Sequence, residues 1–160
     1  MTTTGSSVSP TPAYPRDVPP VWLLLALACI WLLHWLAPGP VLIAAPWTWL
    51  GYALAALSLA FMVGAALLFR RLGTGVRPFS PATMLVAQGP FRFTRNPMYL
   101  GMVGLVTGIA FGVGSAMPLL VPPLFFALLD RRFVRNEERF LRERFGSAYD
   151  DYCRRVRRWL

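Results

Sequence analysis

The sequence predicts an all-α integral membrane protein with about four transmembrane helices, followed by cytoplasmic amphipathic helices at its carboxyl-terminal end. Hydrophobic residues make up 56% of the 160 residues and charged residues only 14%, which departs from the composition of soluble domains. The ranges 21–69 and 96–129 contain no Asp, Glu, Lys or Arg. The polar ranges that remain, 1–20, 70–95 and 130–160, are each too short to bury a core of their own, which excludes a separate soluble nucleotide-binding domain.

Proline and glycine divide the first uncharged stretch into two predicted spans. A helix crosses the roughly 30 Å hydrocarbon core with about 17–25 apolar residues, so this stretch fits two helices and a turn. Residues 37–40 read Ala-Pro-Gly-Pro and Pro46 follows, and these residues interrupt a helix. The first two spans are therefore expected at 21–36 and 47–69.

The second uncharged stretch fits two shorter spans, at 98–113 and 116–129. The sequence leaves open whether the turn at 112–116 joins two full spans or makes a shallow hairpin. Small residues at spacings of three and four suit close contact between helices, and the third span carries Gly101, Gly104 and Gly108. His34 lies inside the first span and is interpreted as a packed or interhelical hydrogen-bonding residue rather than a ligand.

The distribution of arginine predicts the orientation in the membrane. All 16 basic residues are Arg, and 15 of them lie at or after Arg70. Cytoplasmic loops of membrane proteins carry an excess of basic residues, so we expect the loop 70–97 and the helices of 130–160 in the cytoplasm. Both termini then lie on the cytoplasmic side of what we expect to be a bacterial inner membrane, and the two Arg-rich segments can close over one site. We interpret 1–20 as a flexible cytoplasmic segment and 21–160 as a single membrane domain.

The net charge of +9 predicts attraction to anionic membrane lipids rather than to nucleic acid, because the Arg residues flank apolar spans. Metal binding has no support, since one His and two distant Cys form no recognisable cluster of ligands. We therefore expect membrane lipids as partners, and neither nucleic acid nor a metal ion.

One acidic residue of the carboxyl-terminal segment faces an apolar stripe. At 100° per residue, a helix over 130–145 places apolar side chains within an arc of about 140°, with Glu137 in its middle and Glu138 at its edge. The stripe consists of Phe133, Val134, Phe140, Leu141 and Phe145. A carboxylate in apolar surroundings costs several kcal/mol unless it is paired or hydrogen-bonded, so Glu137 implies a partner. That partner is either an Arg of the 70–95 loop or a polar or cationic ligand. Gly146 is expected to end this helix before a last, short Arg-rich helix.

A turn-rich motif joins the cytoplasmic loop to the third span. It runs from Gly89 to Gly101 as Gly-Pro-Phe-Arg-Phe-Thr-Arg-Asn-Pro-Met-Tyr-Leu-Gly. Pro97 suits the first position of a helix, whose free N–H groups favour an anionic group. Asn96 either caps this helix or contacts a ligand, and Tyr99 is either an interfacial aromatic or part of the same site.

The motif and the carboxyl-terminal segment together resemble a known superfamily of membrane enzymes. Leu85-Val86 precedes the Gly89 motif, and Glu137-Glu138, Phe145-Gly146, Tyr149 and Tyr152 follow it. This order resembles the isoprenylcysteine carboxyl methyltransferase and phospholipid methyltransferase superfamily over about residues 70–160. The resemblance implies an S-adenosylmethionine-dependent methyltransferase without a Rossmann fold. Its substrate would be a lipophilic small molecule or lipid that presents a carboxylate, a thiol or an amine.

The resemblance also implies which residues surround the S-adenosylmethionine cofactor. They are Leu85, Val86, Gly89, Phe91, Arg95, Asn96, Pro97, Met98, Tyr99, Glu137 and Glu138. Asn96 stands where isoprenylcysteine enzymes carry His, and Phe133 where they use an Arg for the substrate carboxylate, which weakens the case for a prenylcysteine substrate. The catalytic residues are unknown, with Glu138 the nearest candidate for a general base. Glu137→Ala is expected to abolish cofactor affinity, and Arg158→Ala to leave it nearly unchanged.

Two other functions are left open by the sequence. Sterol-type reductases show a distantly similar carboxyl-terminal region, so a membrane reductase that uses a nicotinamide cofactor is one of them. A non-enzymatic scaffold that binds anionic lipids through the Arg-rich tail is the other. Only the methyltransferase is expected to bind S-adenosylmethionine, and only the reductase NADPH.

Overall fold

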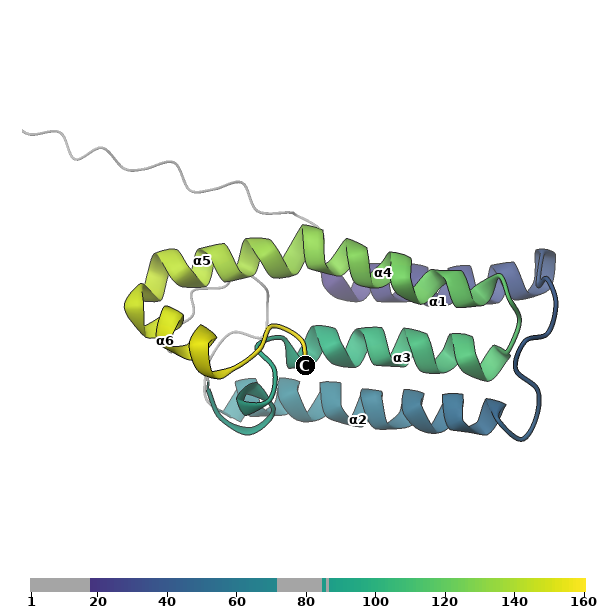
Figure 1. Cartoon of the computed structure of the whole chain (residues 1–160), viewed down its shortest axis with the longest axis horizontal. Helices are drawn as coiled ribbons and strands as arrows, with labels where there is room; N and C mark the ends of the chain where they lie inside the picture. The colour runs from purple at the N-terminus through teal and green to yellow at the C-terminus, as the bar shows by residue number, and fades with distance from the viewer. Residues whose placement is uncertain (1–17, 72–84, 86) are drawn as a thin grey trace, which may run out of the picture.

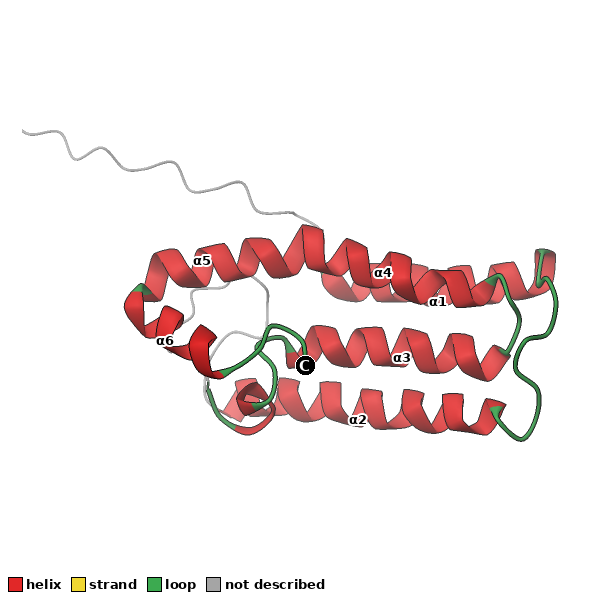
Figure 2. Cartoon of the chain, in the orientation of Figure 1, coloured by secondary structure: helices red, strands yellow, loops and turns green. Residues whose placement is uncertain are grey.

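The chain folds into a bundle of helices that lie side by side along one long axis (Figure 1). The computed structural model describes residues 18–71, 85 and 87–160. Within these ranges the chain is helical and contains no β-strand, only an isolated bridge between Val41 and Ser115 (Figure 2). The all-α class predicted from the sequence is therefore confirmed. Almost all of the predicted segment 1–20 lies outside the described residues.

Three helices lie within two residues of the first three predicted spans. They are α1 (Pro19–Leu36), α2 (Thr48–Arg71) and α3 (Pro97–Val113). Proline opens both α1 and α3, where its missing N–H removes no intrahelical hydrogen bond. Gly114 ends α3 in the left-handed conformation, with φ of +74°, which glycine adopts without steric cost.

The fourth predicted span ends at Leu129, as the sequence suggested, but its α-helix starts later than predicted, at Val121. A short 3-10 turn, η2 (Pro118–Leu120), leads into α4 (Val121–Leu129). The chain then passes through a π-helical turn, η3 (Asp130–Val134), into α5 (Arg135–Phe145). Figure 1 shows α4 and α5 as one continuous rod. The chain therefore continues as a helical rod past Leu129, because no proline or glycine between 124 and 145 interrupts it.

The two uncharged turns lie together at one end of the bundle. The amides of Leu42 and Ile43 donate hydrogen bonds to the carbonyl of Gly114, over 2.9 and 3.1 Å. At the same end, His34 Nδ1 and Ser115 Oγ are 3.1 Å apart, so the histidine is hydrogen-bonded, to the turn after α3 rather than to another helix. The Arg-rich helices α5 and α6 (Ser147–Arg155) lie at the opposite end (Figure 1). The described residues just before α3 meet these helices there, since Arg95 Nη1 lies 3.3 Å from Glu138 Oε1.

Glycines hold α2 and α3 in close contact. A Cβ atom on Gly108 would lie 2.5 Å from the backbone nitrogen of Ala55, and one on Gly104 would lie 2.3 Å from Ser58 Oγ. A Cβ atom on Gly101 would lie 2.7 Å from the Cβ atom of Met62. Distances this short leave no room for a methyl group, so the predicted packing role of these three glycines is confirmed. This contact fixes where the start of α3 lies relative to α2.

The outer faces of α1 and α2 are apolar and exposed. Both helices are long and apolar enough to cross a membrane. Only 22% of the apolar stretch of α1 and 17% of that of α2 are buried within the protein. Leu24, Trp35 and Leu57 are among the exposed side chains. The core helix of a soluble protein would bury most of such a surface, so these faces are suited to contact with lipid. The apolar helix α3 is shorter, with 17 residues.

Candidate functional site

The start of α3 meets α5 through a tyrosine and a glutamate. Tyr99 lies in the first turn of α3, is 5% exposed, and stacks on Phe133 with ring centroids 6.4 Å apart. Its hydroxyl donates a hydrogen bond of 2.9 Å to Glu137 Oε2 on α5. The structure thus joins two residues that are 38 positions apart in the sequence and that belong to the predicted cofactor set.

Glu137 is partly buried beside the fully buried Phe133 and Val134. Burial raises the pKa of Glu137 above its usual value, although the hydrogen bond from Tyr99 partly offsets this shift. No arginine among the described residues lies within ion-pair distance of its carboxylate, and Arg77 of the 70–95 loop lies outside those residues. Tyr99, not an arginine, is thus the polar partner that the structure gives to this carboxylate.

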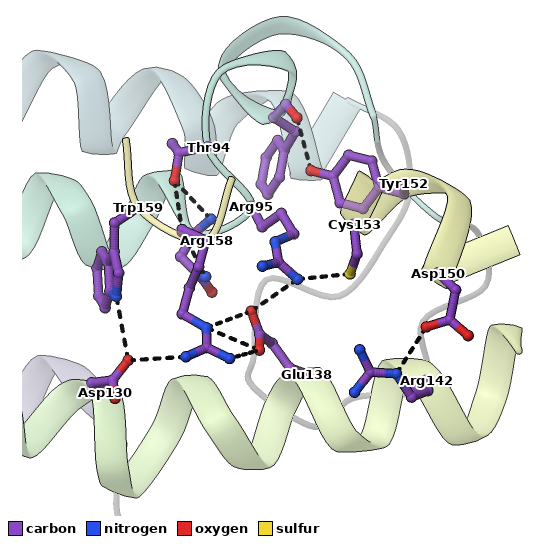
Figure 3. A network of polar contacts seen from close by, with 12 residues as sticks. Thr94, Arg95, Asp130, Glu138, Arg142, Asp150, Tyr152, Cys153, Arg158 and Trp159 are labelled. Atoms are coloured by element: carbon purple, nitrogen blue, oxygen red, sulfur yellow. Dashed lines mark hydrogen bonds and ion pairs between the residues drawn. The ribbon is translucent and has the colours of Figure 1, made fainter. Parts of the chain in front are cut away.

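Glu138 is more deeply buried than the sequence predicted. Its carboxylate, 5% exposed, accepts three hydrogen bonds of 2.6–3.0 Å from the guanidinium of Arg158 and lies 3.3 Å from Arg95 Nη1 (Figure 3). The sequence placed it at the edge of the apolar stripe, and did not indicate that Arg158 of the tail and Arg95 before α3 cover it there.

Asn96 does not cap α3. Its side chain makes no capping hydrogen bond, and Nδ2 donates instead to the carbonyl oxygen of Arg158 over 3.0 Å. The fully buried hydroxyl of Thr94 donates to the same oxygen over 3.1 Å and accepts the Asn96 amide over 3.2 Å. The capping interpretation is therefore wrong. The competing contact, with the carboxyl-terminal tail, is a long-range one that local sequence does not reveal.

Arg95 lies between Glu138 and α6. Its Nη1 donates to Cys153 Sγ over 2.6 Å, next to the ion pair with Glu138 (Figure 3). Its Nε is buried and has no hydrogen-bond partner among the described residues. A buried N–H group without a partner is rare and costs about 1–3 kcal/mol, so this atom is available to an acceptor.

The remaining residues of the predicted set line the same end of the bundle. Phe91, in η1 (Gly89–Arg92), packs with Met98 against Ala65 of α2. Its carbonyl accepts a hydrogen bond of 2.7 Å from Tyr152, and burial raises the pKa of that tyrosine to about 12. A neutral Tyr152 therefore donates this bond throughout the physiological range of pH.

Leu85 also lies at this end, against the aromatic cluster of α6 that contains Tyr149. Gly89 has φ of +56°, a left-handed conformation that suits glycine, and Pro97 is fully buried. Val86 lies outside the described residues. The described members of the predicted set thus come from the chain just before η1, from η1 itself, from the turn between η1 and α3, from the first turn of α3, and from α5.

Sequence reasoning missed the part played by the tail. Arg158 contacts Glu138 through its side chain, and Asn96 and Thr94 through its carbonyl, so the tail lies against residues of the predicted set. The indole of Trp159 donates to Asp130 over 3.3 Å. No local pattern in the sequence signals that the last residues turn back toward the start of α3.

Comparison with known proteins identifies the family. The model of the phospholipid methyltransferase family matches residues 46–148, which is more than half of the chain. The chain belongs to the phospholipid methyltransferase family. The match covers α2, α3, α4 and α5 and ends just after the start of α6, so it includes both Tyr99 and Glu137. Membership supports methyltransferase activity and association with membranes.

Two relatives match part of the chain. Over 81 residues, 49% of this chain, the sequence is 31% identical to mouse Delta(14)-sterol reductase TM7SF2, of which the match covers 19%. Over 63 residues, 39% of this chain, it is 29% identical to an uncharacterized protein of Haemophilus influenzae, which is covered completely. The chain thus spans about a fifth of the length of the sterol reductase. No solved structure matches the chain significantly.

Proposed function

We propose that this protein transfers a methyl group from S-adenosylmethionine to a lipophilic acceptor in the membrane. The observation that carries the proposal is the Glu137 carboxylate, which is partly buried beside apolar side chains and is hydrogen-bonded to Tyr99. Among the residues that the structure describes, no arginine forms an ion pair with it. A cationic ligand would offset the cost of this buried charge. Membership of the phospholipid methyltransferase family supports a methyl donor as that ligand.

The chemistry of the donor set fits S-adenosylmethionine. The cofactor carries a sulfonium, an ammonium and a carboxylate, and so needs both an anionic and a cationic partner. Glu137 would hold one of its cationic groups, and the unpartnered Nε of Arg95 would donate to its carboxylate. The aromatic ring of Tyr99 and the apolar side chains of Phe91, Met98 and Leu85 would contact its uncharged parts.

When bound, the cofactor supplies a methyl group on a sulfonium, which a nucleophile displaces in line. The protein residues then have to bind, orient and exclude water rather than form a covalent intermediate. The hydrogen bond between Tyr99 and Glu137 fixes the carboxylate at one position, against the first turn of α3. Glu138 is already paired with two arginines, which argues against its use as a general base.

The acceptor would enter from the bilayer and the cofactor from water. The exposed apolar faces of α1 and α2 support contact with lipid, and we propose that α3 and α4 complete a set of four spans in one membrane domain over 21–160. The Arg-rich end would then face the cytoplasm with both termini, in a bacterial inner membrane. A carboxylate, a thiol and an amine are the acceptor groups to test.

The test is a titration of the detergent-purified chain with S-adenosylmethionine and, separately, with NADPH. The proposal predicts binding of the former alone, together with transfer of a labelled methyl group into an extracted lipid fraction. Binding of NADPH alone would overturn it in favour of a reductase, and binding of neither compound would favour a non-enzymatic lipid-binding scaffold.

A membrane reductase is the second candidate function. The similarity to mouse Delta(14)-sterol reductase TM7SF2 favours it, but that similarity covers only 19% of the reductase. The family match to phospholipid methyltransferases extends over more of this chain. Methyl transfer therefore has the broader support.

A further inference from the structure

The last five residues of the chain form a strap, residues 156–160, that crosses from α6 to the start of α3. The strap leaves α6 in an extended conformation at Val156. The carbonyl of Arg157 accepts a hydrogen bond of 3.0 Å from the Arg95 amide. Further along, Trp159 packs on Phe126 with ring centroids 4.7 Å apart. Backbone, indole and guanidinium groups all anchor this short segment.

Arg158 is the residue of the strap that contacts both sides of the proposed cofactor site. On one side its guanidinium donates paired hydrogen bonds to Glu138 of α5. On the other side its carbonyl oxygen accepts the hydrogen bonds of Thr94 and Asn96, directly before α3. Figure 3 shows this residue between the helix of Glu138 and the turn of Thr94. One residue therefore links the two elements that carry Glu137 and Tyr99.

The chemistry of this link is specific to arginine. A guanidinium binds a carboxylate through two parallel N–H groups, whereas a lysine offers a single flexible ammonium. Glu138 is almost fully buried, so removal of one of its two arginine partners leaves a charge that water does not fully compensate. A change at Arg158 should therefore shift the position of α5 against α3.

We infer that Arg158 is a positioning residue of the cofactor site, which sets the distance between Glu137 on α5 and Tyr99 on α3. This inference rests on the proposed function. It assigns Arg158 no contact with the cofactor or with the reacting atoms. Its effect reaches the cofactor through Glu138 and Asn96.

The experiment measures the dissociation constant of S-adenosylmethionine by calorimetry for the wild-type chain and three variants. Arg158→Ala should raise the dissociation constant about tenfold or more. Arg158→Lys should recover part of the lost affinity because lysine keeps the charge, but not all of it because lysine lacks the two parallel N–H groups. Arg155→Ala is the matched control, since Arg155 is exposed and, among the residues that the structure describes, bonds only to the carbonyl of Asp151 in its own helix. This control should bind like the wild type. Amide hydrogen exchange should also show loss of protection at the Arg95 amide in Arg158→Ala alone.

The outcomes separate this inference from the proposed function. If the wild-type chain binds no S-adenosylmethionine, the proposed function fails and the inference fails with it. If the wild type binds and Arg158→Ala binds equally well, the inference alone is overturned. It is also overturned if Arg158→Ala and Arg158→Lys lose binding and thermal stability to the same extent, because Arg158 would then be needed for folding only.

Discussion

Replacement of Glu137 by glutamine removes the charge of the proposed cofactor contact and keeps its shape. The amide oxygen of glutamine can still accept the 2.9 Å hydrogen bond from Tyr99, so the junction of α3 and α5 should persist. A hydrogen bond to a charged group contributes about 1.5–3 kcal/mol to the free energy of binding. For this partly buried carboxylate we take about 2–3 kcal/mol. Since each 1.4 kcal/mol is a factor of ten, Glu137→Gln should weaken binding of S-adenosylmethionine about 30- to 140-fold.

The assay for this prediction is calorimetric titration of the purified variant in detergent. Glu143→Gln is the matched control, because it makes the same chemical change on the exposed face of the same helix. The control should bind within about twofold of the wild type. Equal affinities of Glu137→Gln, Glu143→Gln and the wild type would refute the assignment of Glu137 to the cofactor site.

Three further predictions concern pH and packing. Burial raises the pKa of Glu137 in the folded state, so the folded chain holds this proton to higher pH than the unfolded chain does. The stability that comes from this difference is full below pH 4.5, the ordinary pKa, and declines as pH rises through the folded pKa. Denaturation at several pH values should show this decline in the wild type and less of it in Glu137→Gln. Gly108→Ala should destabilise the chain by about 1–3 kcal/mol, since its methyl group would lie 2.5 Å from the backbone of α2. Gly64→Ala, where the added methyl group meets open space, should not destabilise it. Equal melting temperatures of the two variants would contradict this packing. Ser115→Ala should cost about 1 kcal/mol through loss of the 3.1 Å hydrogen bond with His34, and no change in stability on denaturation would argue against that bond.

The helices were largely predictable because proline and charge mark their ends. Pro97 opens α3 where the sequence predicted a helix start, and Gly146, with φ of +51°, separates α5 from α6 as expected. The end of the fourth span is marked by charge alone, since Asp130 follows Leu129 with no proline or glycine to break the helix. A π-turn at 130–134 depends on how α4 and α5 pack, and a helical pattern at fixed periodicity does not reveal it.

The candidate site was predictable in its members but not in their pairing. Glu137 was identified from its helical position, and the structure shows it partly buried beside the predicted apolar residues. The buried ion pair, however, forms at the neighbouring Glu138, because the tail brings Arg158 against that residue. Arg158 was missed because its contacts lie 20 and 62 residues away in the sequence, beyond the reach of any local pattern.

A structure of the chain with S-adenosylmethionine bound would test most directly whether Glu137 holds the cofactor. It should place a cationic group of the cofactor in contact with the Glu137 carboxylate, between α5 and the first turn of α3, with the Tyr99 hydrogen bond retained. A cofactor bound elsewhere, or a Glu137 carboxylate paired with an arginine of the chain instead, would contradict this role.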